Sequence, residues 1–388
     1  MALSRQSQIF DINKIFWNIF GIWPGKVPMK YYKFYSLMYI TITTVTYNIL
    51  LTLNLFYTPR NLEAMIREVV FYFTEVAVIG KVVMILVMRE KIIAILKLMD
   101  CKEFQGENSK GKEILNKTFS TYTKFWKAMA IVSNFSYFSF IVLPILLHLI
   151  WKADIELPIC KYYFLSDDAK EKYFWTWYIY QSFGIYGHMT YNINVDSFIA
   201  GLMWVAIGQL KMLNHNFSQL AHSHKSVLVD SGSTKTLNKL LRHYDIILRY
   251  CSDVQKIVSV VMFVQFCMAS LIICVAMFGL LMVSSPDVFY GMISYLSIMT
   301  MQIFVPGWLG TQLEFESQEL MVAAYNTDWI PKSESFKRSL RLFILRARNP
   351  IVITGYKIFP LSLKTFIAIM KMAYSFFALL RKLQDRQM

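Results

Sequence analysis

Residues 257–283 read IVSVVMFVQFCMASLIICVAMFGLLMV and contain no charged side chain. A helix needs roughly 20 apolar residues to cross the hydrocarbon core of a bilayer, and this stretch exceeds that length. Transmembrane β-strands are only about ten residues long and alternate between polar and apolar side chains. The stretch therefore predicts a membrane-spanning helix.

Six other stretches have a similar length and apolar character. The chain of 388 residues is 56% hydrophobic and 17% charged, whereas soluble domains have about a quarter charged residues. We therefore predict an all-α membrane protein, with a single seven-helix domain over residues 1–388. The expected spans are 34–56, 69–87, 128–150, 174–207, 257–283, 288–309 and 358–380, and residues 310–357 are expected to form a cytoplasmic anchor helix region.

The distribution of basic residues predicts the orientation of the chain. The amino-terminal segment and the second, fourth and sixth loops together hold 27 Lys and Arg residues, whereas the alternate segments hold 9. Cytoplasmic segments carry the excess of basic residues, so the amino terminus is expected in the cytoplasm and the carboxyl terminus outside. The same loops account for the net charge of +15, and no nucleic acid partner is expected.

This polarity is the reverse of that in G-protein-coupled receptors, the first alternative class. A receptor of that class would place the sequons Asn116-Lys117-Thr118 and Asn216-Phe217-Ser218 outside, where they would be glycosylated, whereas the predicted polarity leaves them unmodified in the cytoplasm. A transporter, the second alternative class, would show saturable uptake without single-channel steps.

Two cytoplasmic segments have the spacing of amphipathic helices. In the fourth loop the apolar positions are Leu237, Leu240, Leu241, Tyr244, Ile247, Leu248 and Cys251, and in the sixth they are Phe336, Leu340, Phe343 and Ile344. Such helices can lie on the lipid headgroups or dock together as a cytoplasmic anchor bundle, and the sequence leaves both possibilities open.

The sequence contains no pattern typical of catalysis. It has no P-loop, no HExxH and no nucleophile motif in a suitable context. The five cysteines have neither zinc-ligand spacing nor an even count. We therefore expect no enzyme activity, no cofactor and no metal.

Three charged residues fall inside the second and fourth expected spans, where charge is unfavourable. Glu75 and Lys81 are separated by about 9 Å of rise and some 240° of rotation on one helix, so each is expected to meet another helix, a ligand or water. We interpret Lys81 as snorkelling to the interface. Asp196 is interpreted as the residue at which the fourth span ends and a cytoplasmic extension begins.

Lys357, Lys364 and Lys371 are spaced by seven in the expected last span, so they form one stripe along a helix. The stripe is expected to face water, carboxylates or the inner mouth of a pore. The alternative is interfacial anchoring with one buried lysine that has a partner.

With the predicted polarity, the outer halves of the second, third, fourth and sixth spans bring aromatic and polar residues together. This composition is typical of a site for a small apolar ligand, although aromatic residues at helical spacing also occur in ordinary cores. The candidate ligand-binding residues are Tyr72, Glu75, Phe138, Ser139, Tyr180, Gly184, His188, Tyr290, Ser294 and Ser297.

The carboxyl-terminal sixty residues carry a recognisable pattern. Tyr325 and Trp329 precede an expected helix, and an Arg-x-x-x-Pro break ends at Pro350. A Phe-Pro-Leu-Ser-Leu run over 359–363, Thr-Phe and a Tyr-Ser pair at Tyr374 follow. As a combined string this closely resembles the signature of insect odorant receptors. Related gustatory receptors, a further alternative, end in Thr-Tyr and then Gln-Phe, which this chain does not match.

The resemblance implies an odour-tuning subunit of a non-selective cation channel that forms a tetramer with the shared odorant co-receptor. It implies a volatile hydrophobic ligand, a location in the plasma membrane of olfactory neuron dendrites, and a pore formed by the final helices. By position in that helix, Met372, Ala373 and Phe376 would lie near the gate, with Lys371 and Ser375 on the lysine stripe beside them.

Overall fold

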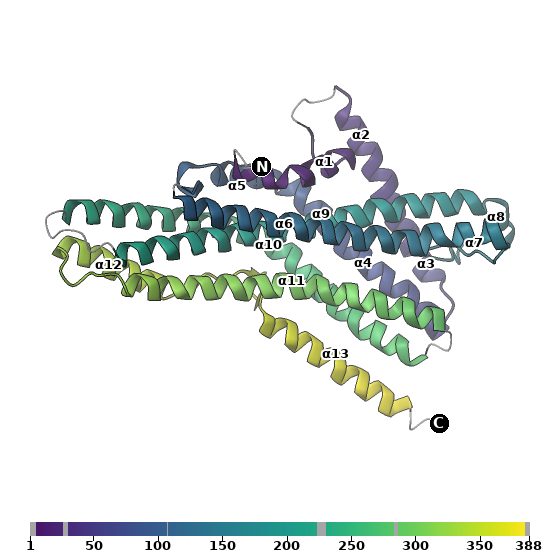
Figure 1. The fold of residues 1–388 in the computed structure, drawn as a ribbon. Coiled ribbons are helices and arrows are strands. Elements are labelled where there is room, and N and C mark those ends of the chain that lie inside the picture. Colours follow the sequence, from purple (N-terminus) through teal and green to yellow (C-terminus); the bar gives the residue numbers. More distant parts are fainter. Residues whose placement is uncertain (1–4, 26–29, 107, 223–229, 283–285, 385–388) are drawn as a thin grey trace.

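The computed structural model describes residues 5–25, 30–106, 108–222, 230–282 and 286–384. Most of these residues are helical, and several of the longest helices run side by side along one axis, whereas α13 leaves the body of the molecule obliquely (Figure 1). The long helices are α4 (Leu62–Val87), α6 (Ser109–Tyr137), α9 (Phe174–His222), α10 (Asp230–Met282), α11 (Pro286–Tyr325) and α13 (Leu363–Gln384). The shorter ones are α1 (Asp11–Ile19), α2 (Tyr32–Ile40), α3 (Tyr47–Tyr57), α5 (Arg89–Met99), α7 (Leu143–Trp151), α8 (Asp167–Lys172) and α12 (Glu334–Ala347).

Short turns of other helix types join several of these elements into longer rods. The π-helical segment η2 connects α2 to α3, and η4 connects α6 to α7. Their bounds, with those of the 3₁₀ turns, are η1 (Gln6–Phe10), η2 (Thr41–Thr46), η3 (Lys102–Phe104) and η4 (Phe138–Val142).

Within the described residues, six helical segments are long and apolar enough to cross a membrane. They are Tyr32–Tyr57, Ala64–Val87, Ser109–Trp151, Phe174–Leu220, Gly232–Leu280 and Met292–Tyr325. Helix α13, with lysines at 364 and 371, is outside this set but completes seven. The predicted all-α fold with seven membrane helices is therefore confirmed.

Helix α9 is the centre of the fold. It contacts α4, α6, α10 and α11, and nearly all of its apolar stretch is buried. The amino-terminal helix α1 lies across it, where Asn13 Nδ2 donates to the Asn194 carbonyl at 2.9 Å and to Ser197 Oγ at 3.0 Å. These contacts tie the start of the chain to the middle of α9.

The helices predicted to be cytoplasmic form a bundle at the end of the molecule where α12 lies (Figure 1). The Phe343 ring stacks on Phe217 of α9 and meets Tyr244 of α10 edge-on, each with centroids 5.0 Å apart. Phe336 and Leu340 of α12 are also buried. Of the two sequence-based possibilities, docking as an anchor bundle is therefore the one that the fold adopts.

The segment before α13 is a hairpin and not a helix. Strands β1 (Thr354–Gly355) and β2 (Phe359–Pro360) pair antiparallel. In the turn between them Lys357 has φ of 59°, in the left-handed region that a helix does not contain. The prediction that Lys357 continues the lysine stripe of the last helix is therefore wrong, and the helix begins at Leu363.

The hairpin is held against α10 and directs α13 away from the body of the molecule (Figure 1). Gln255 donates from Nε2 to the Thr354 carbonyl at 2.9 Å and accepts from the Thr354 amide at 2.8 Å. Gly310 of α11 lies under Leu361, where a Cβ would be 1.8 Å from the carbonyl oxygen. Only glycine fits this close approach between α11 and the start of α13.

Candidate ligand-binding site

A cavity of about 750 Å³ lies between α4, α6, α9 and α11 in the half of the molecule away from the anchor bundle. Its volume is within the range of small-molecule sites. Most lining side chains are apolar, and the helices supply Ile66, Val70, Phe71, Val78, Met129, Tyr137, Phe140, Ile141, Ile185, Met189, Ile193, Ala276, Gly279, Met292, Ile298 and Met299.

Each wall of the cavity is one face of a helix. On α9 the lining positions are 185, 188, 189, 192 and 193, and on α11 they include 292, 295, 298, 299 and 302. Spacings of three and four residues place side chains on one side of a helix. The same spacing that builds a helical core here surrounds an open volume.

A loop covers one end of the cavity with Pro158, Ile159, Lys161 and Tyr163. Its backbone is held by side chains from the helices. Gln181 accepts from the Ile159 amide at 3.0 Å and donates to the Cys160 carbonyl at 2.9 Å. Asn54 accepts from the Tyr163 amide at 2.8 Å. The loop is thus fixed to α3 and α9.

Charged residues near this loop are arranged in pairs of opposite sign. Lys161 Nζ is 2.7 Å from Glu156 Oε1. Arg67 lies 3.9 Å from Glu156 and 3.5 Å from Glu68. Glu68 also accepts from Asn54 Nδ2 at 2.8 Å. Because both cations lining the cavity have carboxylate partners, this end carries little net charge.

Two groups of polar contacts lie deeper in the cavity wall. The Glu75 side chain contacts His188 Nδ1 through Oε2, and His188 Nε2 is 2.7 Å from the Thr43 carbonyl oxygen. Glu75 and His188 are 2% and 1% exposed. Next to them, the Tyr295 hydroxyl contacts Thr74 Oγ1. Glu75 therefore meets another helix, as predicted.

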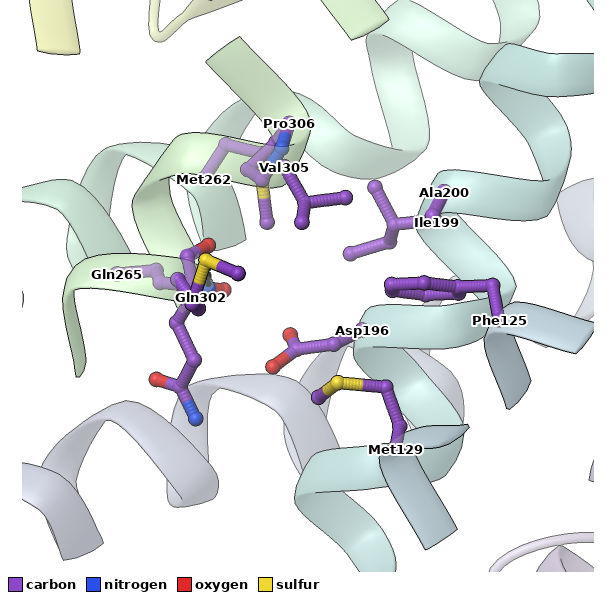
Figure 2. A pocket seen from close by; sticks show the side chains of 11 residues that line it. Phe125, Met129, Asp196, Ile199, Ala200, Met262, Gln265, Gln302, Val305 and Pro306 are labelled. Atoms are coloured by element: carbon purple, nitrogen blue, oxygen red, sulfur yellow. Dashed lines mark hydrogen bonds between the residues drawn. The ribbon is translucent and has the colours of Figure 1, made fainter. Parts of the chain in front are cut away.

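A second, much smaller cavity of about 20 Å³ lies on the other side of Met129 and Gln302, which line both spaces. Figure 2 shows the Asp196 carboxylate directed into it, opposite Gln265 and Gln302. Lys81 Nζ lies 2.6 Å from Asp196 Oδ1 and donates to Asn192 Oδ1. This buried ion pair joins α4 to α9.

The pair corrects one sequence-based interpretation. Lys81 is 1% exposed and does not snorkel to the interface, because Asp196 supplies a counter-charge inside the helix bundle. Helix α9 continues without a break beyond Asp196 to His222, and the end of its membrane part at Asp196 stays a prediction. The expectation that Lys81 meets another helix is confirmed.

Of the ten candidate ligand-binding residues, Glu75, His188 and Ser294 line the large cavity. Six others lie elsewhere, namely Tyr72, Phe138, Ser139, Tyr180, Gly184 and Ser297. The Tyr180 hydroxyl donates to the Ile42 carbonyl at 3.0 Å, and a Cβ on Gly184 would be 2.6 Å from the Tyr47 ring. The tenth, Tyr290, is in α11, but its side chain lies outside the described part of the structure.

Ser139 and Ser297 use their hydroxyls within their own helices. Ser139 donates to the Phe135 carbonyl at 3.0 Å and Ser297 to the Ile293 carbonyl at 2.9 Å. Phe138 is exposed on the outer surface. Tyr72 is half-buried beside Phe73. These positions have the expected residue types on faces of the helices other than the one that borders the cavity.

Several cavity residues were not among the candidates, most notably Asn192 and Tyr295. Asn192 is one helical turn beyond His188, and a search at i+4 from a buried polar residue would have found it. Tyr295 gives no comparable signal, because the chain has 23 tyrosines and its partner Thr74 is far away in sequence.

The candidate gate residues lie on α13, where its outward face carries Lys371, Met372, Ser375 and Phe376. Ala373 is 0% exposed and packs against the other helices of its own chain. Met372 and Phe376 are one turn apart and share a face, as do Lys371 and Ser375. Within this subunit, Ala373 thus does not face outward with the other four.

Comparison with known proteins agrees with this architecture. Residues 61–374 match the family model described as 7tm Odorant receptor. The chain is 31% identical over 147 residues to Odorant receptor 10 of Aedes albopictus, covering 38% of this chain and 39% of the relative. It is 28% identical over 255 residues to Putative odorant receptor 92a of Drosophila melanogaster, covering 65% and 62%. The aligned region therefore spans less than two thirds of either relative.

Other similarities extend over nearly the whole chain. Odorant receptor 2a of Drosophila melanogaster is 24% identical over 384 residues, or 94% of each protein. The insect olfactory receptor OR5 from Machilis hrabei, solved in complex with eugenol, has the same fold with a TM-score of 0.83. That match covers 97% of this chain and 98% of the other at 17% identity.

Proposed function

This chain belongs to the 7tm odorant receptor family, and from that premise we propose that it is the odorant-binding subunit of a ligand-gated, non-selective cation channel. The channel is a heteromer with the odorant co-receptor. The channel lies in the plasma membrane of olfactory neuron dendrites. The amino terminus of this chain is cytoplasmic and its carboxyl terminus is outside. The ligand is a volatile, hydrophobic small molecule.

The observation that carries this proposal is the cavity of about 750 Å³ inside a multi-pass membrane protein. Its lining is mainly apolar with a few convergent polar groups, the composition that binds small organic ligands. Transfer of an apolar odorant from water into such a space lowers its free energy. The Glu75–His188 and Thr74–Tyr295 contacts give one part of the wall a defined polarity.

The helices that enclose the cavity also support the route from ligand to gate. Helices α10 and α11 line the cavity and both contact α13. Gly307 and Gly310 of α11 lie against the backbone of Ser362 and Leu361 at the start of α13. Gly310 approaches the Leu361 carbonyl oxygen so closely that a Cβ would be 1.8 Å from it, and we therefore expect a shift of α11 toward this segment to move the start of α13.

Helix α13 is the element we assign to the pore. Its outward face carries Lys371, Met372, Ser375 and Phe376, and this face has no cover within the described chain. In a mixed tetramer the lysines of this subunit are diluted by other subunits, and fewer ammonium groups repel cations in the pore.

The test is whole-cell voltage clamp of cells that express this chain with and without an insect odorant co-receptor, using a broad volatile panel and a GTP-free pipette solution. We expect a rapid cation current that requires both the co-receptor and an odorant. A response that disappears when GTP is withheld would overturn the channel mechanism. Failure of every volatile, with surface expression confirmed and a co-receptor agonist still opening the channel, would overturn the ligand-binding role.

A further inference from the structure

The polar atoms in the middle of the large cavity can be assigned as donors or acceptors. His188 Nε2 is 2.7 Å from the Thr43 carbonyl oxygen. A carbonyl only accepts, so Nε2 carries a hydrogen. The Glu75 Oε2···His188 Nδ1 contact then holds a single proton, located on either atom.

The remaining oxygen of Glu75, Oε1, is an acceptor in both cases. If the shared proton is on His188, Glu75 is a carboxylate; if it is on Oε2, then Oε1 is a carbonyl oxygen. Among the described residues Oε1 receives no hydrogen bond, while Glu75 lines the cavity. The dyad therefore offers a ligand one acceptor and no donor.

The neighbouring contact gives the same result. Thr74 Oγ1 donates to the Val70 carbonyl at 3.0 Å, so its only polar hydrogen is used. In the Thr74–Tyr295 contact the Tyr295 hydroxyl must then be the donor. Both polar hydrogens are thus committed within the protein, and the oxygen atoms that remain available can only accept.

The other polar groups of the cavity do not reverse this preference. Arg67 and Lys161 have carboxylate partners at the loop end, and the nearby Lys81, which does not line the cavity, is engaged by Asp196 and Asn192. Hydroxyls such as those of Ser133 and Ser136 can donate or accept, so they do not discriminate. Asn192 Oδ1 already accepts from Lys81, so this amide is left with its N–H groups to donate. A hydroxyl oxygen and an ether oxygen can both accept such a bond, so Asn192 does not discriminate between them, and the Gln302 amide can donate or accept.

We propose that the ligand is an uncharged, mainly apolar molecule that carries one hydrogen-bond donor, a hydroxyl or a ring N–H, and that this group donates to Glu75 Oε1. The inference rests on the proposed function of the cavity. Aldehydes, ketones, esters and ethers of the same skeleton bring only acceptors to this position. They leave an acceptor facing an acceptor, with neither hydrogen-bonded.

Matched ligand pairs test the proposal in the co-receptor assay. The pairs are p-cresol with 4-methylanisole and 1-octanol with 1-methoxyoctane, in which the hydroxyl is replaced by a methyl ether. We expect the hydroxyl member of at least one pair to act at a concentration about tenfold lower than its ether, because a hydrogen bond to a charged or shared-proton carboxyl has about this effect.

Two variants separate the acceptor from the general shape of the site. Glu75→Leu removes Oε1 and should reduce the ether-to-hydroxyl ratio of effective concentrations from about ten to about one. In Glu75→Gln the amide can donate to His188 Nδ1 and keeps an acceptor oxygen, so the preference should remain. Thr52→Val removes a hydroxyl that donates within its own helix, outside the cavity, and serves as a control with wild-type ratios.

The outcomes distinguish this inference from the proposed function. Equal or reversed potencies within the active pairs, or an unchanged ratio in Glu75→Leu, would overturn the donor assignment while leaving the receptor intact. Silence of all four compounds, when another volatile opens the channel, would also overturn it. If no volatile opens a surface-expressed channel, the proposed function itself fails.

Discussion

The two halves of helix α9 use polar side chains differently. In the half near the loop, His188 and Asn192 border a cavity of about 750 Å³. In the half near the anchor bundle, every polar group of Gln209 is paired within the protein. Its amide donates to Gln6 Oε1 at 3.2 Å and to the Phe104 carbonyl at 3.0 Å, and its oxygen lies 2.9 Å from His243 Nε2.

The contrast shows how one continuous helix serves two purposes. A buried polar group whose hydrogen bonds are all made within the protein fixes the packing of its neighbours. A buried group with one remaining acceptor beside an open volume is available to a ligand. The difference lies in what surrounds each residue and not in the residue types, since both arrangements contain a histidine and an amide, with His188 and Asn192 in one and Gln209 and His243 of α10 in the other.

The largest expected effect comes from breaking the ion pair at the boundary between the halves. Lys81→Met leaves the Asp196 carboxylate without its counter-charge, and loss of one partner of a buried pair costs about 3–5 kcal/mol. We expect little folded protein at the cell surface, measured by surface biotinylation and by thermal unfolding of the detergent-purified chain.

The double variant Lys81→Met with Asp196→Leu provides the control. Replacing both charges by apolar groups is often neutral, so surface expression should recover in large part. Equal stability of the single and double variants would show that the 2.6 Å contact does not hold α4 to α9.

Acid pH should weaken the bundle half selectively. Burial lowers the pKa of His243 to about 4, Lys239 acts in the same direction, and Glu103 opposes them. His243 lies in the charged part of α10, well before the apolar stretch at 257–283. Because the unfolded histidine titrates near 6.5, its contribution to stability is complete above about pH 6.5 and is lost as the pH falls toward 4.

The size of this effect is at most about 3 kcal/mol, from 1.36 kcal/mol for each unit of pKa difference. Thermal unfolding between pH 7.5 and pH 4.5 measures it, and His243→Gln should reduce the slope in that window. An unchanged slope in His243→Gln would assign the acid sensitivity to other groups.

A pair of glycine substitutions tests the packing on either side of the boundary. A Cβ at Gly201 would lie 2.5 Å from the Phe10 ring and 2.7 Å from the Tyr122 ring, whereas at Gly80 the nearest atom would be a Val264 methyl at 3.7 Å. Gly201→Ala should lower stability by about 1–3 kcal/mol because rigid rings must move.

Gly80→Ala is the matched control in a helix beside the cavity. It should be neutral or stabilising by up to about 1 kcal/mol, because alanine is favoured over glycine in helices. Thermal unfolding of the two variants side by side gives the comparison. Equal effects would indicate that Gly201 is no more tightly packed than Gly80.

The smallest effect on stability is expected on α13, which belongs to neither half. Lys371 is exposed, so Lys371→Gln should change stability by no more than about 0.5 kcal/mol. If this side chain faces the pore, removal of its charge should raise cation conductance. Single-channel recording with the co-receptor measures this, and an unaltered channel would argue against a pore-facing Lys371.

Most of the fold could be predicted from the sequence, because long apolar runs determine where membrane helices lie. The charge-free run at 257–283 lies in α10 except for its last residue, which falls outside the described residues. The start of the last helix was not accessible, because 354–360 forms a hairpin through pairing with itself and with Gln255. Such long-range contacts leave no periodic signal.

The site was accessible only in part. Glu75 and His188 stand out because charge and imidazole are rare inside membranes, and both line the cavity. Aromatic and hydroxyl residues gave no such discrimination, since Tyr180 and Ser297 have the same residue types but lie on other faces. Neighbouring positions on a helix lie on different faces, so a difference of one position decides whether a side chain borders the cavity or the outer surface. Composition does not specify which face a residue occupies.

The continuity of α10 has a mechanical consequence. The helix carries Gly279 in the cavity wall and Tyr244 in the anchor bundle, two points about 50 Å apart at 1.5 Å per residue. Over that distance a tilt of about five degrees moves one end by roughly 4 Å relative to the other. The helix can thus act as a lever arm, because a small change in its angle at the cavity end moves residues in the anchor bundle by about the width of a side chain.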